Sequence, residues 1–368
     1  INDNENLSII YETIDVSKYK TRQLRDRRIK KVKKKYQHIL TVLASGKDKN
    51  LTKEQQRVLD LWPEKTSTKT FKRAKKRLRF QLGQSDKFRA GLIRSGSWKK
   101  YILNTLDEMD LPREIAALPH VESSFNYKAY SKVGAAGMWQ FTRSTGRRYM
   151  RIDHVMDERL DPFIASVAAA QLLKNNYEVT GSWPMAITAY NHGAAGVRRA
   201  AKKVGSKDIT KILRHYKSRS FGFASRNFYP SFLAAVEIDS QPEHYFPGIQ
   251  LNPSASYEFV DLPAYIRMDT ILDIFNINQK DLKESNPALR ATVWNGDKYI
   301  PKDYRLRFSR NIIKKIKEPD ELLASIQSEQ LFQAQKLDRY HKVRKGQTLS
   351  TIAARYKLKT RDLIVANN

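Results

Sequence analysis

The nine residues Leu118–Asn126, LPHVESSFN, lie in the most informative region of this sequence, Pro112–Gly193. The pattern from Arg113 to Ser123 predicts a short helix with Glu122 near its C-terminal end. Because the helix dipole and apolar neighbours both disfavour a carboxylate there, we expect the pKa of Glu122 to be raised toward a value that suits a general acid. A glutamate at a helix end is more often simply solvated, so this feature alone is weak evidence for catalysis.

Other acidic residues matter because cleavage of a glycosidic bond ordinarily uses two carboxylates. Four acids that follow Glu122 cluster with three arginines, which predicts a salt-bridged scaffold and not a catalytic pair. These residues are Asp153, Asp157, Glu158 and Asp161, with Arg148, Arg151 and Arg159. The sequence therefore predicts a site with one catalytic carboxylate.

The composition is that of a basic globular protein of two or three domains. The chain has 368 residues, 40% of them hydrophobic, and 68 Lys and Arg against 38 Asp and Glu give a net charge of +30. Such a charge predicts a polyanionic partner: nucleic acid, an anionic membrane surface, or a cell wall with peptide carboxylates. No membrane-spanning run of apolar residues is present. The first residue is Ile1 and not Met, from which we expect a processed product whose export signal is not visible.

The sequence predicts no metal or other cofactor. The absence of cysteine excludes disulfides and thiolate metal sites. The seven histidines show no paired ligand spacing. For the two that lie beside the predicted site, His120 and His192, we expect hydrogen-bonding roles.

Helical spacing dominates the chain before about residue 256. Two predicted helices near the N-terminus, Val16–Leu43 and Thr68–Leu82, are strongly basic, and their cationic faces are either solvated or contact a polyanion. Gly134–Gly137 predicts a loop of close approach. The other predicted helices are Leu51–Trp62, Phe88–Ile93, Trp98–Met109, one that begins at Asp161-Pro162, Trp183–Tyr190 and Asn227–Ile238.

An internal repeat begins after Tyr257, where the composition becomes β-branched and aromatic. Eight residues between Met268 and Asn286 match residues 81 positions later, between Leu349 and Asn367. Each copy predicts a strand followed by two helices. We expect 293–307 to supply a closing strand to the first copy, and the second copy to be truncated.

Four motifs of the central region resemble the lytic transglycosylases of glycoside hydrolase family 23, in particular the group of membrane-bound lytic murein transglycosylase D. They are Glu122-Ser123, Gly134-Ala135-Ala136-Gly137-Met138-Trp139-Gln140-Phe141, Asp157-Glu158-Arg159 and Ala189-Tyr190-Asn191. The resemblance covers about residues 84–245. It implies a mainly α protein with a lysozyme-like helical catalytic domain of the goose type, also called SLT.

The resemblance also implies cleavage of the bond between N-acetylmuramic acid and N-acetylglucosamine in peptidoglycan. In that family one glutamate protonates the glycosidic oxygen and then acts as a base while the muramyl 6-hydroxyl attacks its own anomeric carbon. The product is a 1,6-anhydro sugar. A nucleophile within the substrate needs no second carboxylate and gains from proximity.

Site residues carry over from the resemblance by position. Glu122 is the expected catalytic residue. Ser123 is expected to bind sugar or the carboxylate, or to cap the helix end, and Trp139 to contact sugar or to lie in the core. The expected substrate-binding residues are Ser123, Gly137, Met138, Gln140, Tyr190, Asn191 and Tyr229. Tyr229 departs from the family pattern, because the tyrosine of Ala224-Ser225-Arg226-Asn227-Phe228-Tyr229 is displaced by one position.

The second copy of the repeat resembles the start of a LysM domain, a binder of glycans that contain N-acetylglucosamine, through Val343–Leu349, Ile352-Ala353, Asp362-Leu363 and Asn367-Asn368. The first copy resembles a degenerate LysM with either a scaffold or a binding role. The expected organisation is a basic helical extension (1–83), the catalytic domain (84–245), the degenerate module (255–308), a charged helical linker (309–340) and a truncated LysM module (341–368).

The leading hypothesis is therefore a peptidoglycan lytic transglycosylase of the periplasm or cell envelope, as an outer-membrane lipoprotein or a secreted protein. Its expected partners are glycan strands and an anionic wall or membrane surface. The alternatives are a muramidase that uses water on the same bond and a wall-binding protein without activity. We do not expect a nucleic-acid binder, because no nucleic-acid motif accompanies the charge.

Overall fold

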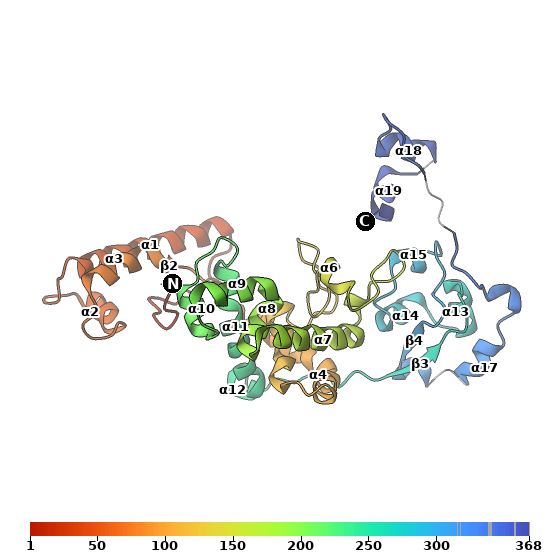
Figure 1. The fold of residues 1–368 in the computed structure, drawn as a ribbon, viewed down its shortest axis with the longest axis horizontal. Helices are drawn as coiled ribbons and strands as arrows, with labels where there is room; N and C mark the ends of the chain where they lie inside the picture. Colours follow the sequence, from red (N-terminus) through yellow and green to blue (C-terminus); the bar gives the residue numbers. More distant parts are fainter. Residues whose placement is uncertain (315, 317, 338–340, 357, 368) are drawn as a thin grey trace. The chain divides into compact units, whose positions relative to one another are not determined.

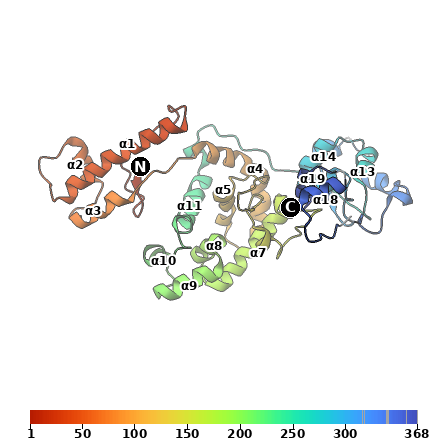
Figure 2. The same ribbon diagram turned by 90° about the horizontal axis from the view of Figure 1, so that it is seen from above.

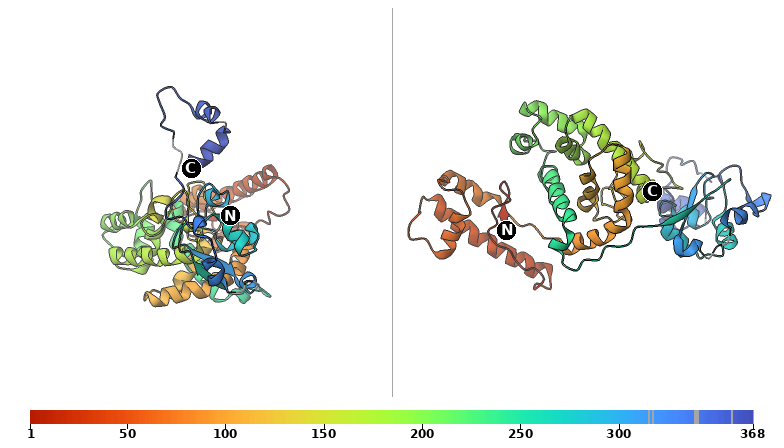
Figure 3. Two further views of the ribbon diagram at one scale, coloured as in Figure 1. Left: turned by 90° about the vertical axis from the view of Figure 1, so that its right-hand side faces the viewer. Right: turned by 90° about the horizontal axis from the view of Figure 1, so that it is seen from below.

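The structure is a computed structural model that describes residues 1–368 except 315, 317, 338–340, 357 and 368. The chain forms two compact units, Ile1–Gln84 and Ser85–Asn368. Most elements are helices, and Figures 1, 2 and 3 follow them from four sides. Among the described residues, no helix is both long and apolar enough to cross a membrane.

The first unit is built on two basic helices, α1 (Arg22–Ala44) and α3 (Thr68–Arg77), which pack on each other. The short α2 (Lys53–Asp60) and a two-residue strand pair, β1 (Asn2–Asp3) with β2 (Leu78–Arg79), complete it. The predicted helices are confirmed but are shorter than expected. Their starts are set by side-chain caps, since Thr21, Thr52 and Ser67 each accept a hydrogen bond from the first helical turn.

The central helices surround one hydrophobic core. They are α4 (Ser85–Glu108), α5 (Leu118–Glu122), α7 (Pro162–Thr180), α8 (Trp183–His192) and α11 (Phe223–Ser240). Buried alanines at positions 165, 168, 169 and 170 allow neighbours to approach α7 closely. Shorter elements complete this region: the 3-10 helices Arg113–Ala117 and Glu158–Leu160, α6 (Arg143–Gly146), α9 (Ala194–Val204), α10 (Ile209–His215) and α12 (Pro242–Tyr245).

One prediction for this region is wrong, and two helices were missed. The expected break between Phe88–Ile93 and Trp98–Met109 does not exist, because α4 continues through the whole stretch. Its Gly96 lies so close to Asn252 that an added Cβ would be 2.1 Å from the Asn252 carbonyl oxygen. Gly96 therefore allows the close approach of Asn252 to the middle of α4. The helices α9 and α10 were not predicted; α9 has a short, basic pattern that buries only Gly196, Val197 and Ala200.

After residue 256 the first copy of the repeat forms an α/β module. Strand β3 (Tyr257–Asp261) pairs antiparallel with β4 (Arg305–Ser309), and α13 (Met268–Ile274), α14 (Gln279–Ser285) and α15 (Ala291–Trp294) lie between them in the chain. The predicted strand at 293–307 is wrong in its first part, because Val293 and Trp294 end a helix. β-branched and aromatic residues suit both states when they are buried, and here tertiary packing chose the helix.

The second copy keeps the two helices of the repeat. The helices α18 (Leu349–Arg355) and α19 (Thr360–Asn367) begin 81 positions after α13 and α14. The expected strand before them is not found in the described residues 341–356. One bond is conserved between the copies: the side-chain amide of Asn286 donates to Leu282, and that of Asn367 to Leu363.

The segment expected to be a linker packs on the first module as far as Lys336. It contains α16 (Arg310–Ile313), α17 (Pro319–Ala324) and the 3-10 helix Ser328–Gln330. Leu323 and Ile326 are buried in the module core, and Phe332 exchanges two backbone hydrogen bonds with Tyr265. Residues 338–340, the end of the predicted linker, lie outside the described residues. The five domain boundaries stay predictions.

Candidate active site

Glu122 is the last residue of α5. Its side chain is half-buried beside the fully buried Leu118 and Phe125, and its carboxyl group makes no hydrogen bond with the described residues. Burial raises the pKa of Glu122 to about 8, as the sequence predicted. At neutral pH the group is therefore largely protonated and can donate a proton.

The chain turns sharply after Glu122. Ser124 and Phe125 have φ values of 52° and 57°, a left-handed conformation that costs a residue with a side chain roughly 1–2 kcal/mol. The guanidinium of Arg94 donates two hydrogen bonds to the Ser124 carbonyl oxygen, at 2.9 and 2.6 Å, and the Phe125 amide donates to Pro119 at 3.1 Å. Helix α4 comes this close because it has Gly91, where an added Cβ would be 3.1 Å from Ser124 Cβ. Two strained residues thus hold Glu122 in position.

A hydrogen-bonded cluster around Asp239 supports the same helix. His120, two residues before Glu122, contacts Asp239 of α11 through Nε2 at 3.0 Å, and Lys99 lies 2.7 Å from the second carboxylate oxygen. Although burial acts to raise it, the pKa of Asp239 is lowered by these two partners. Burial lowers the pKa of His120, whose ring lies between Phe88 and Phe125. The hydrogen-bonding role expected for His120 is confirmed, and His192 likewise contacts Ser225 at 3.0 Å.

Ser123 connects Glu122 to the next motif. Its hydroxyl donates to the carbonyl oxygen of Met138 at 2.7 Å and accepts from the amide of Asn126 at 3.1 Å. Ser123 also stands at the C-terminal end of α5, where its backbone amide donates to the carbonyl of Pro119, so it occupies the helix end as the sequence allowed, while a bond from Ser123 to the carboxyl group of Glu122 is not present. Sugar binding by Ser123 stays a prediction.

The glycine-rich motif forms a tight loop. Gly137 has a φ of +82°, and an added Cβ would lie 1.7 Å from the carbonyl oxygen of Arg159, so no other residue fits. Gln140 has a φ of 50°, and its amide donates to the Gly137 carbonyl at 2.8 Å. The loop is the close approach that the sequence predicted.

Met138 and Trp139 lie in the core, which for Trp139 is one of the two roles that the sequence left open, while substrate binding by Met138 stays a prediction without support from its side chain. Both side chains are buried, with exposed fractions of 0% and 1%, and the Trp139 indole donates to Ser166 at 2.9 Å. Both side chains lie in the core cluster that includes the buried alanines of α7, and this packing holds the loop against that helix. For Met138, a predicted substrate-binding residue, the side chain has no surface to offer.

Tyr190 lies in the electrostatic environment of Glu122. Its pKa is raised well above the ordinary value, first by burial and then by the charge of Glu122. Its hydroxyl donates to the Trp139 carbonyl at 2.8 Å, which links α8 to the glycine-rich loop. The structure thus brings Glu122, Tyr190 and this loop together. The next residue, Asn191, is exposed, and its side-chain oxygen accepts from Ser225 at 3.4 Å.

Tyr229 lies on α11, the helix that packs against both α5 and α8. Its ring stacks on Phe232 with centroids 6.2 Å apart, and burial raises its pKa. Its hydroxyl makes no hydrogen bond with the described part of the chain. A supporting role for Tyr229 stays a prediction.

The acidic cluster is a scaffold, as expected. Arg159 and Asp157 are both buried and form two hydrogen bonds of 2.8 Å, and Arg159 also donates to the carbonyls of Gly134 and Phe141. Arg151 pairs with Asp153 at 2.7 Å. No carboxylate contributes to the pKa shift of Glu122. Among the described residues, then, Glu122 has no acidic neighbour of the kind that a two-carboxylate mechanism needs.

Sequence reasoning missed one partner of this scaffold. Asp161 caps α7 and pairs with Arg307 of strand β4, and both side chains are buried. Nothing in the sequence pairs two residues 146 positions apart. Arg148, expected in the cluster, instead lies over the ring of Tyr149.

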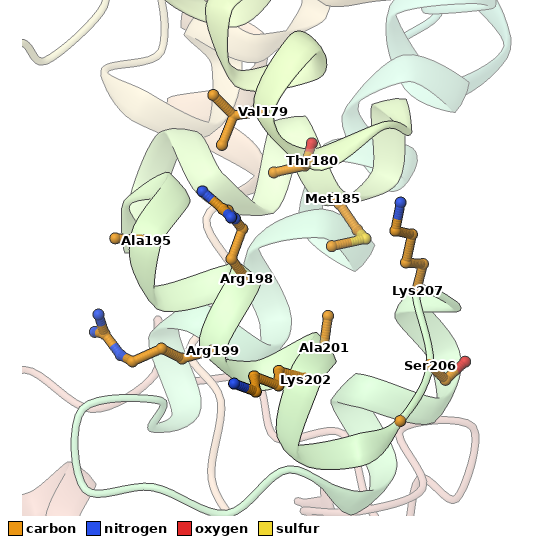
Figure 4. A pocket seen from close by; sticks show the side chains of 11 residues that line it. Val179, Thr180, Met185, Ala195, Arg198, Arg199, Ala201, Lys202, Ser206 and Lys207 are labelled. Atoms are coloured by element: carbon orange, nitrogen blue, oxygen red, sulfur yellow. The ribbon is translucent and has the colours of Figure 1, made fainter.

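No group of three or more His, Asp or Glu side chains in the described ranges could hold a metal ion. A separate cavity of about 730 Å³ lies between α9 and the ends of α7 and α8 that face it (Figure 4). Met185 lines its interior, and four cations surround it: Arg198, Arg199, Lys202 and Lys207. None of its lining residues is a predicted site residue.

Comparisons with known proteins agree with the motifs. The family model of the transglycosylase SLT domain matches residues 101–213, and that of the LysM domain matches residues 341–368. Membrane-bound lytic murein transglycosylase D of Escherichia coli (strain K12) is 27% identical over 281 residues, which are 74% of this chain and 60% of that protein. A putative tributyltin chloride resistance protein of Alteromonas sp. (strain M-1) is 28% identical over 163 residues, 44% of this chain and 77% of that protein.

Among solved structures, the lytic transglycosylase Slt of Pseudomonas aeruginosa aligns with 40% of this chain and 24% of its own, at 20% identity and a TM-score of 0.33. The chain spans about 60% of the length of the Escherichia coli relative. The two domain matches and the relative confirm the resemblance found in the motifs, and with the helical structure they confirm the predicted fold class.

Proposed function

We propose that this chain, which carries a transglycosylase SLT domain and a LysM domain, is a peptidoglycan lytic transglycosylase with Glu122 as its one catalytic carboxyl group. The observation that carries the proposal is the half-buried, unpaired Glu122 with a pKa of about 8 and no acidic neighbour. A glutamate that is protonated at neutral pH suits the first step, proton donation to the glycosidic oxygen as the bond to the muramyl anomeric carbon breaks.

The second step returns the proton. The Glu122 carboxylate accepts the proton of the muramyl 6-hydroxyl while that oxygen bonds to its own anomeric carbon, which gives a 1,6-anhydromuramyl end. The hydroxyl is already part of the substrate, so proximity replaces a second carboxylate. The strained turn at Ser124 and Phe125 supports this by fixing the carboxyl group, and the neighbouring Tyr190 by orienting the substrate together with Gly137, Gln140 and Asn191.

The LysM domain supports binding of peptidoglycan glycan, and we assign it a targeting role. The first module is better suited to a scaffold. Its Arg307 forms a buried ion pair with Asp161, and the backbone amide of Arg290 donates to the carbonyl of Val155 at 2.9 Å. Two residues of the module therefore stabilise the segment that supports the glycine-rich loop. The relative named membrane-bound supports a place in the cell envelope. A lipid anchor or secretion stays a prediction.

Digestion of purified sacculi tests the proposal. The expected products, identified by mass spectrometry, are anhydromuramyl ends that disappear with Glu122→Gln. Reducing muramyl ends that depend on Glu122 would instead make the chain a muramidase. Binding to sacculi without any product would leave it a wall-binding protein.

A further inference from the structure

The first unit carries two cationic stripes with the same spacing. On α1 the stripe is Arg27, Lys30, Lys31 and Lys34, and on α3 it is Lys69, Lys72, Arg73 and Lys76. Both sets follow the pattern i, i+3, i+4, i+7, which places four side chains on one face of a helix. All eight side chains are exposed, and none forms an ion pair or hydrogen bond within this fully described unit.

Several other basic residues of the unit are instead paired within it. Arg28, Lys35, Arg57 and Arg77 all pair with carboxylates of the same unit, which therefore serve its folding. The unit has 23 Lys and Arg against 9 Asp and Glu, a net charge of +14 in 84 residues. Eight unpaired cations in two rows repel one another and stabilise nothing in the unit. They are therefore available to an anionic partner.

The stripes point in opposite directions. On α1 the buried residues Val32, Tyr36, Ile39, Leu40 and Leu43 lie on the face opposite the stripe, and on α3 so do Phe71 and Ala74. Since α1 and α3 pack on each other through these buried faces, the stripes project from the two outer sides of the pair.

We propose that this unit binds the carboxylate-bearing stem peptides of peptidoglycan on both sides at once, as an electrostatic clamp within the wall mesh. A flat membrane can touch only one stripe at a time, whereas a mesh surrounds the unit. The exposed large hydrophobic residues of the unit are Leu7, Ile10, Leu24 and Leu82, none of them aromatic, and only Leu24 lies beside a stripe. The unit therefore lacks the apolar or aromatic face with which helices insert into a bilayer. Six of the eight cations are lysines, which are strongly hydrated point charges suited to many loosely placed carboxylates.

The choice of peptidoglycan rests on the proposed function, and its test is separate. Every protein carries Glu122→Gln, so that the polymer stays intact. One variant changes the four α1 residues to Gln, a second changes the four α3 residues, and a third changes all eight. The matched control changes Lys20, Lys47, Lys49 and Lys53 to Gln, which removes the same charge from exposed positions of the same unit outside the stripes. Circular dichroism checks that all of them fold.

Binding to sacculi is measured by sedimentation at low salt, beside vesicles of anionic phospholipid. On sacculi, each stripe variant is expected to bind about tenfold more weakly and the eight-residue variant about a hundredfold, because both stripes act together. On vesicles, where the unit binds through one stripe or the other, the affinity of each single variant should fall by about twofold or less. The control should bind sacculi as the parent does. The differences should vanish in 1 M salt, where the Debye length is about 3 Å, and on sacculi with amidated carboxylates.

Three results would overturn the proposal: single variants that bind sacculi as the parent does, a control as weak as the stripe variants, or tighter binding to vesicles than to sacculi. Failure of the proposed function would be seen in a different measurement, the release of products by the chain that keeps Glu122. A parent chain with Glu122 that binds through its stripes but releases no anhydromuramyl product would reject the enzyme and leave the clamp.

Discussion

Charged side chains are used differently in residues 1–84 and around Glu122. In the first unit the eight stripe cations lie on the surface without partners. Around Glu122 the charges are buried and paired: Arg159 with Asp157, Arg307 with Asp161. The difference teaches how to interpret charge. Exposed unpaired charges are available to a partner, and buried paired charges stabilise the scaffold. Glu122 is the exception, since it is half-buried and unpaired, and this points to a catalytic role.

The largest expected effect on activity comes from removing the carboxyl group of Glu122. Glu122→Gln keeps the shape of the side chain but cannot donate a proton, so the release of soluble muropeptides from sacculi should fall by about a thousandfold. Glu178→Gln, an exposed glutamate on α7, is the control and should retain full activity. A loss of less than tenfold at Glu122 would remove it from the mechanism.

Breaking a buried pair should affect stability. Asp157→Ala leaves the Arg159 guanidinium buried without its carboxylate and should lower the free energy of unfolding by about 3–5 kcal/mol, measured with urea. Arg151→Ala removes a partly exposed pair with Asp153 and should cost about 1 kcal/mol or less. Equal losses at the two pairs would mean that burial does not distinguish them.

The pH dependence of stability should show that Glu122 is unpaired. Because its pKa is about 8 in the folded chain and near 4.5 when unfolded, the unfolded chain ionises first, and stability is lost as pH rises from about 4.5 to 8. Glu122→Gln removes this loss. The substitution should leave the free energy of unfolding unchanged at pH 4 and raise it at pH 9 by on the order of 3 kcal/mol. This value already allows for the screening by solvent that a half-buried group experiences. A variant no more stable than the parent at pH 9 would contradict the raised pKa.

The same pKa predicts how activity responds to pH. Proton donation requires protonated Glu122, so the rate should fall as pH rises through about 8. A pH–rate profile on sacculi measures this. A rate that declines already between pH 4 and 6 would indicate an ordinary, solvated glutamate.

The smallest expected effect concerns the turn after Glu122. Arg94→Ala removes two hydrogen bonds from the Ser124 carbonyl and should lower the rate at saturating substrate about tenfold by loosening Glu122. Adding Ser124→Gly should restore part of the rate, because glycine adopts this φ without strain. Arg89→Ala, an exposed arginine of the same helix, is the control. If Ser124→Gly lowers the rate further, Arg94 does not act by holding Ser124 in its strained conformation.

Local patterns carried much of the fold. Apolar spacing located α1, α3, α7 and α8, and Gly137 was expected at a close approach. Failures arose where one pattern fits two structures. The sequence predicted two helices, Phe88–Ile93 and Trp98–Met109, where α4 is continuous, and it predicted a strand from Val293, which lies in the last turn of α15. Met138 and Trp139 suited a sugar face equally well until packing placed them in the core.

The sequence by itself determined the motifs around Glu122, the helical class, the repeat and the cationic stripes, because each depends on spacing along one element. Only the tertiary structure decided which residues meet from distant positions: Arg94 with Ser124, His120 with Asp239, Asp161 with Arg307. It also decided the state of Glu122. The pKa of a carboxyl group depends on how much water the surrounding chain excludes, and that is a property of the packed molecule and not of its neighbours in sequence.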